Sequence, residues 1–65
     1  MKSKEELFEL ISKSQMFDVF EELNKFFLGE NDSLNKLMDE YINQPNNFNQ
    51  AQFSTRLKLF ISRNW

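Results

Sequence analysis

Three carboxylates stand close together in the first half of the chain, at Asp18, Glu21 and Glu22. A helix would place them on one side, where paired carboxylates can transfer protons or bind a divalent cation. The same spacing produces the solvated polar strip that every amphipathic helix needs, or an acidic surface for a basic partner. Nothing nearby predicts burial or a second set of ligands, so the pattern favours the polar strip, and a contact surface remains a hypothesis.

A second group lies near the end of the chain, around Leu59. On a helix of 100° per residue, Leu59 lies about 60° from Arg56 and about 40° from Arg63, away from the apolar face. Arginine is enriched and lysine depleted at protein interfaces, so a leucine between two arginines is typical of a small interface patch. A single exposed leucine is also common on protein surfaces, and the sequence alone does not separate the two interpretations.

Histidine and cysteine are both absent from the chain. This excludes disulfides, imidazole or thiolate metal ligands, and the Ser–His and Cys–His pairs of nucleophilic catalysis. We therefore expect no enzyme activity, no cofactor and no tight divalent-metal site.

The length of 65 residues is enough for one domain, covering 1–65. Eight phenylalanines supply core volume, while one glycine and one proline argue against a turn-rich β protein. No signal peptide or apolar run of membrane-spanning length is present, so we expect a cytoplasmic protein without a membrane partner. Because the chain ends directly after a predicted helix, we also expect that a longer parent protein continues beyond Trp65.

The charge is unevenly distributed. The net charge of −2 makes nucleic acid an unlikely main partner. Residues 1–32 carry eight carboxylates and four lysines, net −4, whereas residues 33–65 carry two carboxylates and four basic residues, net +2. Surfaces of opposite sign can pair between molecules.

The strongest helical pattern spans Met16 to Leu28 and is expected to end at Gly29 in the left-handed position. Ser14 is its predicted N-cap. The apolar positions form one broad face that other elements must cover: Met16, Val19, Phe20, Leu23, Phe26 and Phe27, widened by Phe17 and Leu28.

Three further helices are predicted by their capping residues. A capping box at Ser3 and Glu6 begins a helix that runs to about Ser12. A third helix, with Asn31 or Asp32 as its cap, covers about 33–43 and ends before Pro45. Its apolar stripe is Leu34, Leu37, Met38, Tyr41 and Ile42, and its solvent-facing residues are Lys36, Asp39, Glu40 and Asn43. The last runs from an Asn49 cap to about Arg63, with a Gln52 capping box and a Phe48–Phe53 staple. The sequence thus predicts an all-α, compact four-helix bundle.

The order of apolar positions resembles the effector-associated domains of bacterial conflict systems, in particular the type-eleven subgroup, and bacterial death-like domains in general. The resemblance covers the whole chain and is carried by four groups of residues: Leu7-Phe8-Glu9-Leu10-Ile11; Met16, Phe20 and Leu23; Leu37-Met38 and Tyr41; and Phe53, Leu57 and Phe60-Ile61. It implies a death-like, non-catalytic adaptor in bacterial immunity that binds a protein carrying a like helical domain, with homotypic self-association included.

Two alternatives remain open. A helical DNA-binding regulator could use residues 49–63 as a recognition helix, with phosphate and base contacts from Arg56, Lys58, Arg63, Gln50 and Gln52. A phage-type inhibitor or antitoxin could use the acidic strip to mimic nucleic acid. For the adaptor, the charge distribution predicts that the acidic surface of the first two helices meets the basic surface of the last helix on another molecule. Glu21 and Glu22 represent the acidic surface, and Arg56 and Arg63 around Leu59 the basic one.

Overall fold

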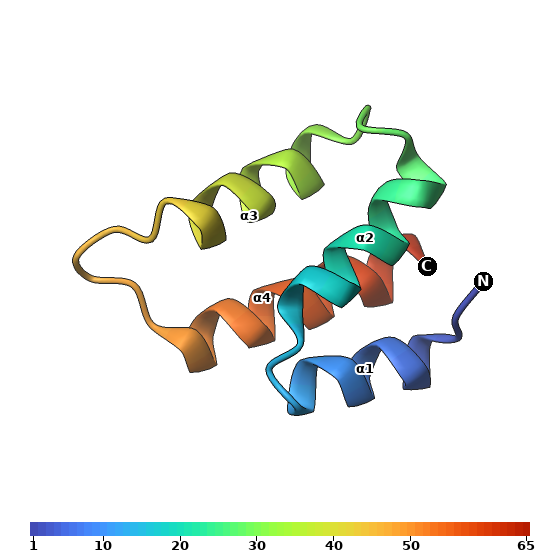
Figure 1. The fold of residues 1–65 in the computed structure, drawn as a ribbon, viewed down its shortest axis with the longest axis horizontal. Coiled ribbons are helices and arrows are strands. Elements are labelled where there is room, and N and C mark those ends of the chain that lie inside the picture. Colours follow the sequence, from blue (N-terminus) through green and yellow to red (C-terminus); the bar gives the residue numbers. More distant parts are fainter.

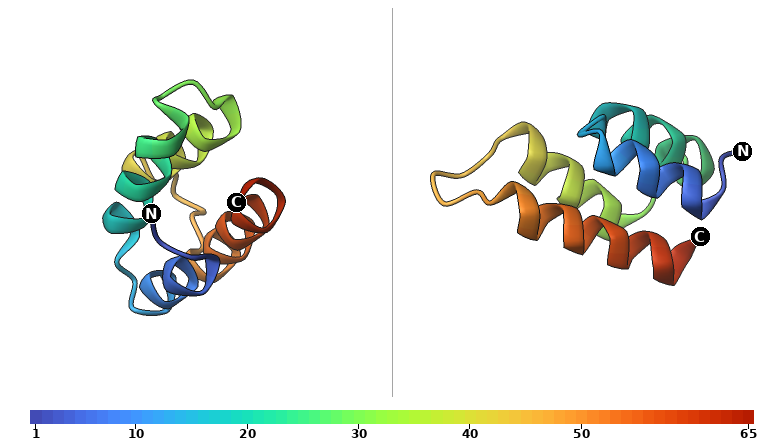
Figure 2. Two further views of the ribbon diagram at one scale, coloured as in Figure 1. Left: turned by 90° about the vertical axis from the view of Figure 1, so that its right-hand side faces the viewer. Right: turned by 90° about the horizontal axis from the view of Figure 1, so that it is seen from below.

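Four helices make up the computed structural model, which describes all residues 1–65. They are α1 (Lys4–Ser12), α2 (Met16–Phe27), α3 (Asp32–Ile42) and α4 (Gln50–Asn64), as Figure 1 shows. By backbone proximity, α1 packs on α2 and α4, and α3 packs on α2 and α4, whereas α2 and α4 meet only through core side chains such as Phe20 and Phe53. The helices therefore form a ring in which α2 lies diagonally opposite α4, as the end view in Figure 2 shows. The predicted all-α four-helix bundle is confirmed.

The buried core is entirely apolar and draws on all four helices. Its members are Leu7, Ile11, Met16, Val19, Phe20, Leu23, Leu34, Phe53, Leu57, Phe60 and Ile61. No polar or charged side chain is buried, so no desolvated hydrogen-bonding group weakens this small core.

Side-chain caps fix the start of three helices as the sequence predicts. Ser3 and Glu6 form the full capping box: the Glu6 N–H donates to Ser3 Oγ at 3.1 Å, and the Ser3 N–H donates to Glu6 Oε1 at 2.8 Å. The Ser3 N–H lowers the pKa of the Glu6 carboxyl, because it stabilises the charged form. Asn31 Oδ1 accepts from Leu34 N at 2.9 Å at the start of α3, in the role foreseen for Asn31 or Asp32.

The start of α4 is confirmed at Asn49, whose Oδ1 accepts from Gln52 N at 3.0 Å. Only this first bond of the predicted capping box forms. The staple is present, with the Phe48 and Phe53 rings 5.4 Å apart.

The start of α2 differs from the prediction, whereas Gly29 after its end has the predicted left-handed backbone, φ 75°. Ser14 does not cap α2; it has φ 58°, and Gln15 precedes the helix without a side-chain cap. The reason is that the Ser14 N–H donates to Ile11 O and the Gln15 N–H to Leu10 O, both at 2.9 Å. These bonds form a Schellman motif that ends α1 and places Ser14 in its left-handed position, so Ser14 is not available to the next helix. At the other end, the left-handed turn begins at Leu28, φ 55°, one residue before Gly29.

The apolar face of α2 is only partly buried. Phe26, which the periodicity placed on the buried face, is 53% exposed; Phe17 and Leu28 are 64% and 76% exposed. On α3, Ile42 is 61% exposed instead of covered. The physical reason is the ring arrangement, because α1 and α3 cover α2 from two sides and no element covers its outer side.

The two ends of the chain lie together. Trp65 packs its ring against Phe26, with centroids 5.1 Å apart, and its indole Nε1 donates to the carbonyl of Lys2 at 2.9 Å. This contact joins the end of α4 to the residues before α1.

Candidate functional site

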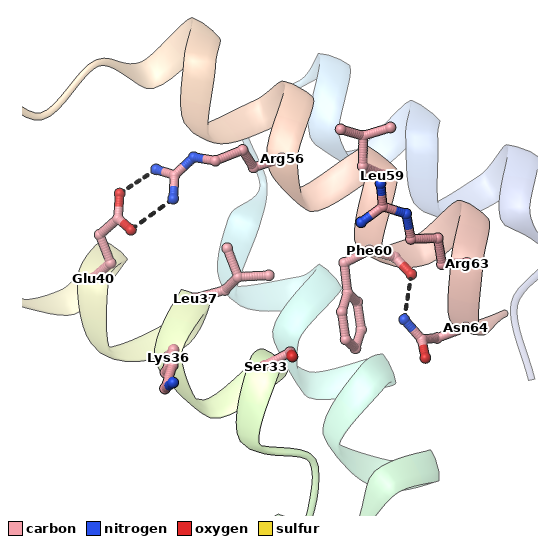
Figure 3. Close-up of a pocket in the computed structure, with 9 residues that line it drawn as sticks. All are labelled: Ser33, Lys36, Leu37, Glu40, Arg56, Leu59, Phe60, Arg63 and Asn64. Atoms are coloured by element: carbon pink, nitrogen blue, oxygen red, sulfur yellow. Dashed lines mark hydrogen bonds and ion pairs between the residues drawn. The ribbon is translucent and has the colours of Figure 1, made fainter.

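An open groove of about 540 Å³ lies between α3 and α4, with the lining residues drawn in Figure 3. Its lining is Ser33, Lys36, Leu37, Glu40, Arg56, Leu59, Phe60, Arg63 and Asn64. The apolar part consists of Leu37 from α3 with Leu59 and Phe60 from α4. Leu59 is 46% exposed, so it presents apolar surface at the groove.

The groove is predominantly positive, with three cations, Lys36, Arg56 and Arg63, against the single carboxylate of Glu40. Arg56 and Glu40 form a bidentate pair across the groove: Nη1 donates to Oε1 at 2.9 Å, and Nη2 donates to Oε2. The Arg56 guanidinium lowers the pKa of the Glu40 carboxyl, and the carboxylate raises the pKa of Arg56. Because the two partners belong to different helices, the pair ties α4 to α3.

Arg63 and Lys36 form no ion pair within the chain, which distinguishes them from Arg56. Figure 3 shows Arg63 beside Leu59 on the same helix, with its guanidinium turned toward the groove. Arg56 is further held by the Phe53 ring, whose centroid lies 5.6 Å from its guanidinium carbon. The free positive charge of the groove therefore lies with Arg63 and Lys36.

The predicted acidic surface lies on α2, diagonally across the bundle from α4. Its members differ in environment. The Glu21 side chain is 68% exposed, whereas that of Glu22 is 19% exposed. Lys25 Nζ lies 3.6 Å from Glu21 Oε1 and 3.5 Å from Glu22 Oε1. Asp18 is exposed. Lys25 thus pairs with both glutamates and partly offsets the negative charge of the strip.

The structure therefore separates the six predicted interaction residues into two sets. Arg56, Leu59 and Arg63 share one groove, while Asp18, Glu21 and Glu22 lie on another helix. Glu22 also borders a smaller hollow of about 360 Å³, formed with Met1, Lys25, Phe26 and Trp65.

Sequence reasoning missed the α3 wall of the groove. Lys36 and Glu40 read as solvent-facing residues and Leu37 as part of the core stripe. The only signal was the spacing of Ser33, Lys36, Leu37 and Glu40, which share one helical face. The partner of Glu40 is 16 residues away in the chain, so no local pattern joins it to Arg56.

The other cation of α4 points elsewhere. Lys58 Nζ lies 6.0 Å from the ring centroid of Phe8 on α1, away from the groove. A recognition helix for DNA needs its cations and polar side chains on one face, so this divergence gives little support to that alternative. Lys25 likewise gives little support to an acidic strip that mimics nucleic acid. No group of three or more potential metal ligands is present.

Comparison of the chain with protein families, curated proteins and solved structures found no match. None of the four helices combines the length and the apolar character needed to cross a membrane.

Proposed function

We propose that this chain is a non-catalytic protein-interaction domain, an adaptor of a bacterial immunity or conflict system, located in the cytoplasm. Its partner is a protein carrying a like helical domain, which includes a second copy of itself. The observation that carries the proposal is the α3–α4 groove, where an exposed leucine lies between arginines on a positive rim. The resemblance to effector-associated and death-like domains supports the immunity setting.

The chemistry of the groove suits a protein partner. An apolar floor with arginine beside it is the composition found at interface centres, where aromatic residues and arginine are enriched. The carboxylates of the acidic strip lie on α2, diagonally across the ring from α4, so the strip and the positive groove of one molecule cannot contact each other. The two surfaces suit contacts between different molecules.

Such contacts should be weak and sensitive to salt. Exposed ion pairs contribute at most about 1 kcal/mol each, so the isolated domain is expected to be monomeric at low concentration. The Debye length falls from about 10 Å at 0.1 M to about 3 Å at 1 M salt, and association should weaken accordingly.

The test is a reciprocal charge reversal at the best exposed residues. Arg63→Glu alone, or Glu21→Arg alone, should weaken association with the like domain, and mixing the two variants should restore part of it. Arg63 suits this test better than Arg56, because Arg56→Glu would face Glu40 within the same molecule. Binding is measured by light scattering and by pull-down, with a tagged second copy of the chain as the bait.

Lys13→Glu, directly after α1, is the matched control for Arg63→Glu, because it makes the same change from a cation to a carboxylate outside both surfaces. Circular dichroism should show equal helix content in all variants. Two results would show that these charges do not form the interface. One is unchanged binding in both single variants, and the other is a mixture of the two variants that binds no better than either alone.

A further inference from the structure

Two exposed sites on this molecule combine a large apolar residue with two charges, which are positive at one site and negative at the other. On α4, Leu59 lies between Arg56, three residues before it, and Arg63, four residues after it. On α2, Asp18 and Glu21 both lie on one side of Phe17, about 100° and about 40° away around the helix. Phe17 is the more exposed of the two apolar residues at 64%.

Phe17 projects from a supported position. Its ring packs edge-on against Tyr41 at 5.5 Å and against Phe20 at 6.3 Å, so its base is fixed while most of its surface faces solvent. A fixed aromatic side chain loses little conformational freedom on binding, which is the property of an interface anchor.

The groove offers the complement of this anchor. Leu37, Leu59 and Phe60 supply the apolar floor, and the free cations Lys36 and Arg63 stand on its rim. A groove of about 540 Å³ has room for an aromatic side chain together with its flanking carboxylates. Glu40 is the one group of the lining that would repel those carboxylates.

We propose that the α3–α4 groove receives Phe17 of a second copy of this chain, with Asp18 and Glu21 of that copy facing Arg63 and Lys36. This rests on the proposed function and specifies its partner and its contacts. Within the groove, Glu40 competes with the incoming carboxylates for Arg56 and so weakens the contact.

The geometry has a direct consequence for assembly. Phe17 and the groove are separate surfaces of the molecule, so the contact is heterologous, and a bound pair leaves one groove and one Phe17 free. The average mass of the wild-type assemblies should therefore continue to rise with protein concentration instead of reaching a limit at the dimer.

The experiment mixes two variants, each lacking one half of the contact. Leu59→Asp spoils the groove and keeps Phe17; Phe17→Ala removes the anchor and keeps the groove. Each alone should remain monomeric by sedimentation and light scattering, whereas the mixture should form a complex that stops at two chains. Phe26→Ala is the control, because it removes an exposed ring from the same helix outside the proposed contact.

Asp18→Lys gives a second acidic-side variant with the Phe17 ring intact, in case Phe17→Ala is poorly folded by circular dichroism. It should behave as Phe17→Ala does, both alone and in the mixture with Leu59→Asp.

Glu40→Gln tests whether Glu40 competes with the incoming carboxylates for Arg56. The substitution should strengthen self-association, whereas a simple loss of contacts would weaken it. It frees Arg56 and should tighten self-association by up to about fivefold, the equivalent of one exposed ion pair. Asp39→Asn is its control, since it removes the same charge from the same helix outside the groove lining.

The outcomes are distinguishable. A mixture that remains monomeric while the wild type associates, or a Glu40→Gln variant that behaves as Asp39→Asn does, overturns the Phe17–groove contact and leaves the proposed function standing. A wild type that never self-associates but binds a different like domain overturns only the second copy as partner. Absence of binding to any like domain contradicts the proposed function itself.

Discussion

The helices α2 and α4 face each other across the ring and use their apolar residues differently. Each contributes four side chains to the buried core. On α2, Phe17 and Phe26 remain exposed, as does Leu28 directly after it, whereas α4 leaves only Leu59 as a large apolar residue at its surface. The start of α4 is fixed by the Asn49 cap and the Phe48–Phe53 staple, while α2 begins without a side-chain cap. The start of α2 therefore depends on packing, whereas a cap and a staple also hold the start of α4.

The largest expected effect of this difference concerns Phe20 on α2. Phe20 is 3% exposed, and its ring lies 5.6 Å from Tyr41 and 6.2 Å from Phe53. Phe20→Ala should lower the free energy of unfolding by about 3–5 kcal/mol, close to the whole stability of a small domain. Phe26→Ala, at an exposed position of the same helix, should cost far less. Thermal and urea unfolding followed by circular dichroism measure both, and equal losses would show that burial does not separate the two rings.

A smaller effect is expected at the start of each helix. Asn49→Ala removes the hydrogen bond to Gln52 N and should cost about 1 kcal/mol. Gln15→Ala at the corresponding position before α2 should cost almost nothing, because Gln15 makes no side-chain cap bond. Urea midpoints of the two variants give the comparison. If Gln15→Ala lowered the urea midpoint as much as Asn49→Ala does, the Gln15 side chain would have to cap α2.

The same contrast explains how far the sequence predicts the fold. The starts of α1, α3 and α4 were predictable because each capping side chain accepts from a backbone N–H only three residues away. The start of α2 was not, because Ser14 serves the end of α1, where its N–H donates to Ile11 O and the Gln15 N–H donates to Leu10 O. Ser14 could end α1 or cap α2, and the spacing of the residues alone does not show which of these roles it takes.

The exposure of the α2 side chains and the lining of the candidate groove depend on contacts between helices, which local sequence patterns do not reveal. Periodicity identified which residues are apolar, but the burial of Phe26 depends on whether another helix reaches it. Leu59 with Arg56 and Arg63 was predicted as one surface because all three belong to one helix. Lys36 and Glu40 joined it only through the packing of α3 on α4, which is a long-range contact.

The end of α2 offers a stabilising substitution. Leu28 has a left-handed backbone, φ 55°, and its side chain is 76% exposed, so it contributes strain and little burial. Leu28→Asn should raise the free energy of unfolding by about 0.5–1 kcal/mol, because asparagine tolerates this conformation better. Gly29→Ala should have the opposite sign, since Gly29 has φ 75° and no neighbour that a methyl group would contact. Chemical denaturation measures both, and a destabilising Leu28→Asn would show that the leucine side chain packs more than its exposure indicates.

The smallest expected effect is the dependence of stability on pH through Glu40, which links α4 to α3. Arg56 lowers the pKa of Glu40 below its ordinary value of 4.5. The carboxylate therefore stabilises the folded state fully above about pH 5, and this contribution is lost as the pH falls through the lowered pKa. For an exposed pair the contribution is at most about 1 kcal/mol.

Glu40→Gln should thus be slightly less stable than the wild type at pH 7, and the gap should close in acid, where the wild-type carboxyl is also neutral. Glu6, whose pKa is lowered by the Ser3 N–H, titrates equally in both proteins and cancels from the difference. Urea unfolding of the two proteins at steps from pH 7 to pH 2 measures the gap, and one that persists unchanged in acid would mean that the Arg56 pair does not stabilise the fold through its charge.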